Sequence, residues 1–259
     1  MALLELDQVA AGYGRRLVLE GVSLAVEAGE VVALLGRNGA GKTTLLRAAA
    51  GILRPRAGRV LVDGRDLARL AVRASARLVA GVAQDDAIEF AFTVRDVVAL
   101  GRYVHRTALG PEGAGDRAAV EEALAVTGFA DLAARPVTEL SGGERRRASL
   151  ARCLAQDAAV MLLDEPTAHV DLGHETRILD TVRERARTKG KAVVAALHDV
   201  NLAAAFADRI VLLEGGRVVA QGPPAVVLTS ERLSALYDVP VEVLRLPGRD
   251  DLFVRPGRR

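Results

Sequence analysis

A glycine-rich loop near the N-terminus has the composition and spacing of a phosphate-binding loop. Residues 36–43 read Gly-Arg-Asn-Gly-Ala-Gly-Lys-Thr and match G-x-x-x-x-G-K-[ST] at every fixed position. A continuously apolar stretch, Val31 to Leu35, precedes the loop, and a helical pattern follows it. The glycines let consecutive backbone N–H groups turn toward anionic oxygens, and the helix that follows adds its positive dipole end. We therefore predict that this loop binds nucleotide phosphates.

The residues of this loop have distinct predicted roles. Lys42 supplies a cation for the β- and γ-phosphates, and the hydroxyl of Thr43 is suited to bind Mg²⁺. The other expected phosphate contacts come from the loop and the first turn of the helix, at Gly36, Arg37, Asn38, Gly39, Ala40, Gly41 and Thr44.

A pair of acids follows another apolar run. Val160 to Leu163 is apolar and is followed directly by Asp164 and Glu165. Such a run predicts a buried parallel strand, and ligands bind at the carboxyl ends of parallel strands. Asp164 is suited to hold the metal, directly or through water, and Glu165 to act as the base toward an attacking water. The alternative is an ordinary surface turn, which the phosphate loop makes the weaker interpretation.

The elements that must position these residues alternate between strands and helices. The first 30 residues show the alternation of antiparallel strands, and the later apolar runs indicate a mostly parallel α/β sheet. Between Gln84 and Ala158 the pattern is helical, with Thr93 and Asp116 as candidate caps. We expect a single domain over residues 1–259. Its core comprises residues 1–84 and 158–259, and residues 85–157 form an inserted helical subdomain.

Composition excludes several classes of protein. The 35 Lys and Arg residues exceed the 33 Asp and Glu residues by a net charge of only +2. The one tight basic run, Arg145–Arg147, is explained by a solvated helix face, so we expect no nucleic-acid partner. Cys153 is the single cysteine, which excludes an internal disulfide, and we expect it to be buried. No basic leader and no run of about 18 apolar residues is present, so we expect a soluble, cytoplasmic chain.

The segment Leu140-Ser141-Gly142-Gly143-Glu144 resembles the signature of ABC-type ATPases, a class of P-loop NTPases. Four further matches to that family occur in order along the chain. Tyr13 matches the aromatic residue that stacks on adenine, and Gln84 matches the glutamine that joins the sheet to the helical subdomain. Asp171 matches the aspartate at the dimer interface, and His198 matches the switch histidine.

This resemblance implies a mechanism that needs two chains. Two copies face each other head to tail, and each ATP lies between the phosphate loop of one copy and Ser141, Gly142 and Gly143 of the other. It also implies that Gln84 and His198 act with Glu165 in catalysis and that Gln84 joins Thr43 and Asp164 at Mg²⁺.

Two positions depart from the family pattern. Arg37 replaces a frequent proline, but the loop backbone still supplies the donors. Glu144 stands where the family often has glutamine, and a carboxylate would repel a phosphate. Because Ser141 and Glu144 form the capping-box pattern S-x-x-E, we expect Glu144 to point back into its own helix.

Three segments, 98–105, 164–174 and 237–241, look like those of ATPase subunits that power importers of iron chelates, haem and vitamin B12. The resemblance thus implies permease subunits, indirectly a substrate-binding protein, and a place at the cytoplasmic face of the membrane. It does not choose the cargo. One alternative is the ATPase of an exporter. Another is a soluble ABC protein acting on ribosomes or DNA, which a single phosphate loop without a heptad run disfavours.

Overall fold

Six strands form the central sheet of the protein. The structure is a computed structural model that describes residues 2–82, 92–106, 113–168, 172–245 and 252–257. The strand order is β10-β9-β3-β8-β7-β6, in which β9, β3, β8, β7 and β6 run parallel and β10 pairs antiparallel with β9. The strands are β3 (Val31–Leu35), β6 (Val79–Val82), β7 (Val160–Asp164), β8 (Ala192–Ala196), β9 (Arg209–Glu214) and β10 (Arg217–Gly222).

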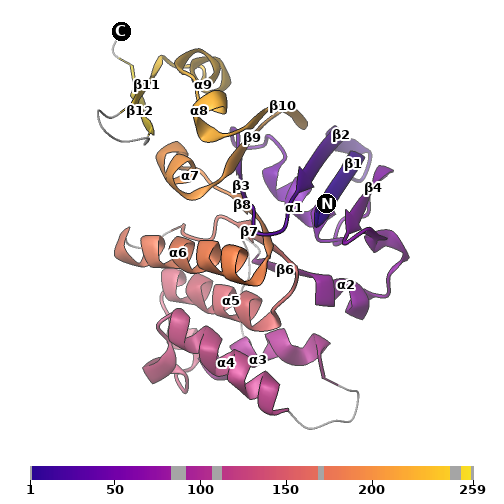
Figure 1. Ribbon diagram of the computed structural model, residues 1–259, viewed down its shortest axis with the longest axis vertical. Helices are drawn as coiled ribbons and strands as arrows, with labels where there is room; N and C mark the ends of the chain where they lie inside the picture. Colours follow the sequence, from indigo (N-terminus) through magenta and orange to yellow (C-terminus); the bar gives the residue numbers. More distant parts are fainter. Residues whose placement is uncertain (1, 83–91, 107–112, 169–171, 246–251, 258–259) are drawn as a thin grey trace.

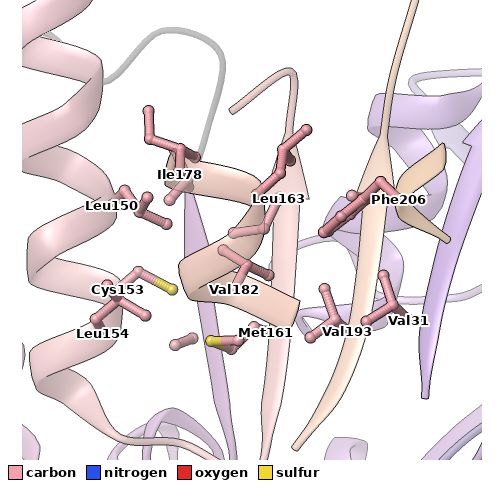
Figure 2. Packing of buried hydrophobic residues seen from close by; sticks show 14 of the residues in the cluster. Val31, Leu150, Cys153, Leu154, Met161, Leu163, Ile178, Val182, Val193 and Phe206 are labelled. Atoms are coloured by element: carbon pink, nitrogen blue, oxygen red, sulfur yellow. The ribbon is translucent and has the colours of Figure 1, made fainter. Parts of the chain in front are cut away.

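The middle of this sheet is buried on both faces. Every residue of β3, β7 and β8 is buried, as their continuous apolar runs predict. On one face, α5 (Gly142–Gln156) and α6 (Leu172–Lys189) pack against β7, with Leu150 and Cys153 facing Ile178 and Val182 (Figure 2). Cys153 is 1% exposed, which confirms that it is buried.

A second, antiparallel sheet lies beside the first, at the right of Figure 1. Its strands are β1 (Leu4–Tyr13), β2 (Arg16–Val26), β4 (Ala57–Val62) and β5 (Arg65–Asp66). Leu4, Leu6, Leu24 and Val26 are buried from alternate positions, as the alternation at the N-terminus predicts. Between the two sheets lies α1 (Lys42–Ala49), and α2 (Val72–Leu78) leads into β6.

Three helices form the lower part of the molecule in Figure 1, namely α3 (Val94–Leu100), α4 (Ala114–Val126) and α5. Short 3₁₀ turns lie at Leu67–Arg69, Gly101–Val104, Ala130–Leu132 and Val137–Glu139. Thr93 caps α3 in a capping box with Asp96, as predicted. Asp116 caps the start of the next helix, as predicted, but it does so from inside the helix and not as the N-cap residue. This helix begins at Ala114, and Asp116 is its third residue, where its carboxylate accepts a bond from the N–H of Gly113.

The C-terminal part continues from the central sheet. It contains α7 (Val200–Phe206), α8 (Pro224–Val227), α9 (Ser230–Tyr237) and a hairpin of β11 (Val241–Arg245) and β12 (Leu252–Pro256). Asn201 ties the hairpin to α7, because its amide bonds both the N–H and the carbonyl of Val254, at 2.6 and 3.0 Å.

The architecture confirms the predicted fold class, a mostly parallel core sheet beside an N-terminal antiparallel sheet. Among the described residues, no helix combines the length and apolar character needed to cross a membrane.

Candidate functional site

The candidate site lies where three neighbouring strands of the central sheet end. β8 pairs with β3 on one side and with β7 on the other, all in parallel. The glycine-rich loop follows β3, Asp164 and Glu165 stand at the end of β7, and His198 stands just beyond β8. Parallel strands place their carboxyl ends at the same edge, so the topology brings these segments together.

The glycine-rich loop adopts a conformation that needs glycine at two places. A Cβ added at Gly36 would lie 2.2 Å from the carbonyl oxygen of Leu213, which belongs to the backbone of the neighbouring strand β9. Gly41 has φ +106° and is the N-cap of α1, and a Cβ there would approach the side chain of Leu19 to 2.9 Å. The loop therefore turns directly into the helix, which begins at Lys42 with its first N–H groups directed at the loop.

Lys42 is buried inside the loop that precedes it. Its Nζ donates to the carbonyl oxygens of Gly36 at 2.7 Å and Arg37 at 3.3 Å. Burial lowers the pKa of Lys42, while the nearby carboxylates of Glu165 and Asp164 act in the opposite direction. The ammonium group is thus held among backbone carbonyls, beside two acids, in the position that a phosphate cradle requires.

Asp164 has the features of a metal ligand. Its side chain is 4% exposed, and burial raises its pKa, opposed in part by a hydrogen bond with Thr43. Its Oδ1 is buried and, among the described residues, has no hydrogen-bond partner. A buried carboxylate oxygen without a partner is costly. Asp164 and Thr43 together present the oxygen ligands that Mg²⁺ prefers, so these residues fit that ion.

Glu165 contacts the predicted switch histidine. Its Oε1 lies 2.5 Å from Nε2 of His198, and the Glu165 side chain is 15% exposed. The backbone of Glu165 has φ +51°, a left-handed conformation that is uncommon for a residue other than glycine. Its N–H donates to Ala196 of β8 at 3.1 Å, and its carbonyl accepts from Ala168 at 3.2 Å. The Glu165 side chain is therefore held in place by contacts to the backbone of the residue and by the contact of its carboxylate oxygen with His198.

The signature segment begins α5. Ser141 is the N-cap, and its Oγ accepts from the N–H of Glu144 at 3.2 Å. In return Oε2 of Glu144 accepts from the N–H of Ser141 at 2.8 Å, and this bond lowers the pKa of Glu144. This confirms the prediction that Glu144 points back into its own helix. Ser141 and Gly142 are exposed, so the start of α5 faces outward.

Tyr13 lies at the end of β1 and is 44% exposed. Its hydroxyl accepts a hydrogen bond from Arg47 of α1 at 3.1 Å. The sequence pattern gave no reason to select Arg47, because it is one of many arginines and its partner lies 34 residues away.

The interpretation of Arg145–Arg147 as a solvated helix face is wrong for two of its three members. Only Arg145 is exposed. Arg146 is half-buried and donates from Nη1 to the backbone carbonyl of Glu165, and Arg147 lies over the ring of Phe129, 4.6 Å from its centroid. Two predicted site residues, Gln84 and Asp171, lie outside the described residues.

Comparisons with known proteins identify relatives of this chain. A family model described as ABC transporter matches residues 19–168. The chain is 47% identical to a cobalamin import ATP-binding protein of Halobacterium salinarum over 92% of this chain, and it spans only 60% of that protein's length. It is 46% identical to a hemin import ATP-binding protein of Rhodococcus jostii, over 98% of this chain and 86% of that protein.

A solved structure extends the likeness to the fold. The whole of this chain superposes on 99% of a chain from a structure described as an inward-facing, metal-chelate type ABC transporter. The TM-score is 0.84 and the sequence identity is 28%.

Proposed function

The chain belongs to the ABC transporter family, and we propose that it is the ATP-binding and ATP-hydrolysing subunit of an importer. The cargo is a metal chelate such as haem, cobalamin or a ferric siderophore. One observation carries the proposal. The phosphate loop, the buried carboxylate of Asp164 and the Glu165–His198 pair meet at one edge of the sheet. The likeness to cobalamin and hemin import ATP-binding proteins supports the importer class.

ATP is bound by the loop and the residues around it. The phosphates are held by Lys42 and by the backbone of the loop and first helical turn, and the exposed ring of Tyr13 stacks on adenine. Mg²⁺ is held by Thr43, Asp164 and Gln84, and when bound it neutralises developing charge on the phosphates. The further contacts come from Gly36, Arg37, Asn38, Gly39, Ala40, Gly41 and Thr44.

Hydrolysis is carried by residues at the end of β7 and β8. Glu165 accepts a proton from the attacking water, and His198, in contact with its Oε1, holds the carboxylate in place. His198, which follows the neighbouring strand β8, thereby orients the Glu165 carboxylate whose oxygen accepts the proton. Gln84, which follows β6 by two residues in the sequence, is assigned to this catalytic group from the family pattern alone.

Two copies of the chain form the complete site. The outward-facing start of α5 supports this arrangement, since a capped helix N-terminus with Gly142 and Gly143 offers N–H groups to an anion. Ser141, Gly142 and Gly143 contact the γ-phosphate held by the other copy, and Asp171 lies at the interface between copies. In this assignment residues 1–259 are one domain, with a core of 1–84 and 158–259 and a helical subdomain of 85–157.

Permease subunits bind at a groove beside β6. The groove has a volume of about 590 Å³ and lies between α1, α2, β6 and α5. Ile52 and Val72 in its lining are 77% and 87% exposed, which supports contact with an apolar partner segment. The chain is held in this way at the cytoplasmic face of the membrane, and a substrate-binding protein delivers the cargo to the permease.

Uptake assays test the proposal and choose the cargo. Cells lacking the gene are complemented with the parent chain or with Glu165→Gln and given labelled haem, cobalamin or a ferric siderophore. We expect the parent chain alone to restore accumulation of one of the three. Accumulation of none, or ATP-dependent loss of a labelled compound from the cells, contradicts import and favours the exporter alternative.

A further inference from the structure

Arg146 of α5 reaches the catalytic loop of its own chain. Its Nη1 donates to the backbone carbonyl of Glu165, 19 residues further along the chain. A bond from a guanidinium to a carbonyl is charge-assisted and is therefore stronger than an ordinary backbone hydrogen bond. Arg146 is half-buried, so the bond is partly shielded from water.

The residue that receives this bond has a backbone that needs support. Glu165 has φ +51°, and a conformation of this kind persists only where the surrounding structure over-determines it. Its support comes from β8 through Ala196, from the following turn through Ala168, and from α5 through Arg146. Of these three contacts, the one from Arg146 is made by a side chain and comes from α5.

The same helix begins at the signature segment. Ser141 caps α5, and Arg146 lies on the second turn of this helix. A helix is stiff over this distance, so a shift of its first turn also moves the Arg146 guanidinium. The bond thus joins the start of α5 to the backbone of the carboxylate that contacts His198.

We propose that Arg146 is a positioning residue for Glu165, and that its bond to the Glu165 carbonyl directs the catalytic carboxylate of the same chain. This inference rests on the proposed function, in which Glu165 is the base of hydrolysis. Arg146 holds the Glu165 carbonyl and so directs its carboxylate at the water. Without the bond, the nucleotide is bound but the base is misplaced.

The first test compares Arg146→Ala with Arg145→Ala in the purified full chain. Both variants remove one arginine from the same helix, but Arg145 is exposed. We expect Arg146→Ala to lower kcat between about 10-fold and 100-fold, because a misplacement of about 1 Å at a catalytic group costs about 100-fold. The KM for ATP and the melting temperature should stay near those of Arg145→Ala. Arg146→Lys, which still carries a donor, should retain more activity than Arg146→Ala.

The second test asks which chain needs Arg146. A mixture of Lys42→Ala and Ser141→Arg chains forms mixed dimers with one intact composite site, whose phosphate loop and Glu165 belong to the Ser141→Arg chain. Arg146→Ala should lower the activity of the mixture by about 10-fold to 100-fold when added to that chain and spare it when added to the Lys42→Ala chain. The opposite pattern, or an equal loss from either chain, overturns the proposal.

The two tests separate this inference from the proposed function. If the mixture without any Arg146 change is inactive, the shared-site arrangement is wrong. Positioning of Glu165 by Arg146 is then still decided by kcat of the variants. If Arg146→Ala raises KM with kcat unchanged, or matches Arg145→Ala in both, Arg146 does not position the base.

Discussion

Nε2 of His198 lies 2.5 Å from Oε1 of Glu165, although 33 residues separate them in the chain. The parallel register accounts for the contact. Asp164 of β7 is paired with Ala196 of β8, so the residues that follow each strand, Glu165 and His198, leave the sheet side by side. A histidine at this place fixes one carboxylate oxygen, and in the proposed function the other oxygen faces the attacking water.

Replacement of Glu165 by glutamine should abolish hydrolysis and leave ATP binding intact. The amide keeps the size of the side chain but cannot accept a proton, and a general base contributes about 100-fold to 10,000-fold to a rate. The variant should accumulate as an ATP-bound dimer on gel filtration. Glu231→Gln, a change in the first turn of α9, is the matched control and should keep the parent rate. Turnover by Glu165→Gln at the parent rate would show that Glu165 is not the base.

Lys42→Ala should weaken ATP binding itself. The change removes a buried cation from a loop that otherwise offers backbone N–H groups. Loss of a hydrogen bond to a charged group costs about 1.5–3 kcal/mol, or roughly 10-fold to 100-fold in affinity. Calorimetric titration with ATP measures the effect, and Lys189→Ala at the end of α6 serves as the control. Equal affinity in Lys42→Ala and the control would refute the phosphate-loop assignment.

Local patterns were sufficient to predict the loop and the acid pair. The runs Val31 to Leu35 and Val160 to Leu163 are apolar at every position, which only a strand covered on both faces requires. The motif residues follow directly, so their place at the sheet edge depends on no distant contact. By contrast α2 has no buried residue, and without an apolar stripe its helix leaves no periodic signal in the sequence.

The three consecutive arginines of α5 show what a local pattern does not contain. Successive residues of a helix point about 100° apart, so Arg145, Arg146 and Arg147 face three different surroundings. One is exposed, one bonds the Glu165 carbonyl, and one covers Phe129. The packing of α5 against β7 and α4 decides which of the three arginines has each of these surroundings. Only the tertiary structure supplies that information.

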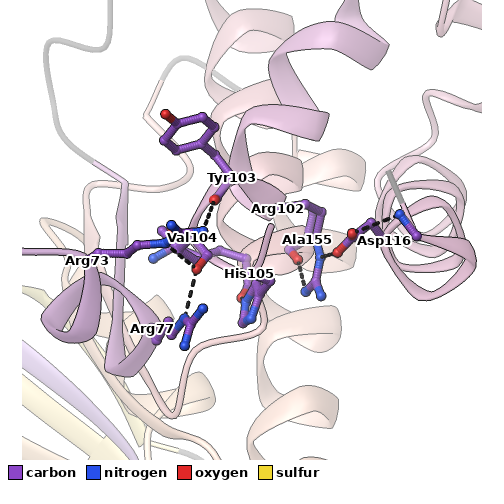
Figure 3. A network of polar contacts seen from close by, with 10 residues as sticks. Arg73, Arg77, Arg102, Tyr103, Val104, His105, Asp116 and Ala155 are labelled. Carbon is purple, nitrogen blue, oxygen red and sulfur yellow. Dashed lines mark hydrogen bonds and ion pairs between the residues drawn. The ribbon is translucent and has the colours of Figure 1, made fainter. Parts of the chain in front are cut away.

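The ion pair of Arg102 and Asp116 should make stability depend on acid pH. Figure 3 shows Arg102 between Asp116 and the carbonyl of Ala155, and both charged side chains are 13% exposed. The hydrogen bond from Arg102 lowers the pKa of Asp116, helped by the N–H of Gly113. A carboxyl whose pKa is depressed in the folded state stabilises it above the ordinary aspartate value. That contribution is lost as the pH falls through the depressed value.

Arg102→Met tests this contribution. At neutral pH the variant should lose about 1–3 kcal/mol in the free energy of unfolding, measured with urea. At acid pH, below the ordinary aspartate value, the difference from the parent should shrink, because the ion pair is lost as Asp116 takes up a proton. A difference that is the same at both pH values would assign the loss to the bond with Ala155 instead of the ion pair.

Ser141→Arg should spare ATP binding and block hydrolysis. The phosphate loop, Asp164 and Glu165 lie at one sheet edge, so one chain holds the nucleotide alone, whereas Ser141 faces outward at the start of α5. A bulky side chain there keeps the two copies apart. Ser141→Ala removes the same hydroxyl, at a cost of about 1 kcal/mol for the lost cap, but adds no bulk, so it should retain more activity than Ser141→Arg.

The dependence on protein concentration decides whether two chains share the site. If they do, the ATPase rate of the dilute parent rises more steeply than linearly with concentration, because each site needs a dimer. The Ser141→Arg chain shows no activity at any concentration, while calorimetry still detects ATP binding. Hydrolysis by Ser141→Arg alone contradicts the two-chain mechanism, as does a strictly first-order rate at dilutions where only monomer is detected. In either case the start of α5 would act as a helix cap and not as a phosphate contact.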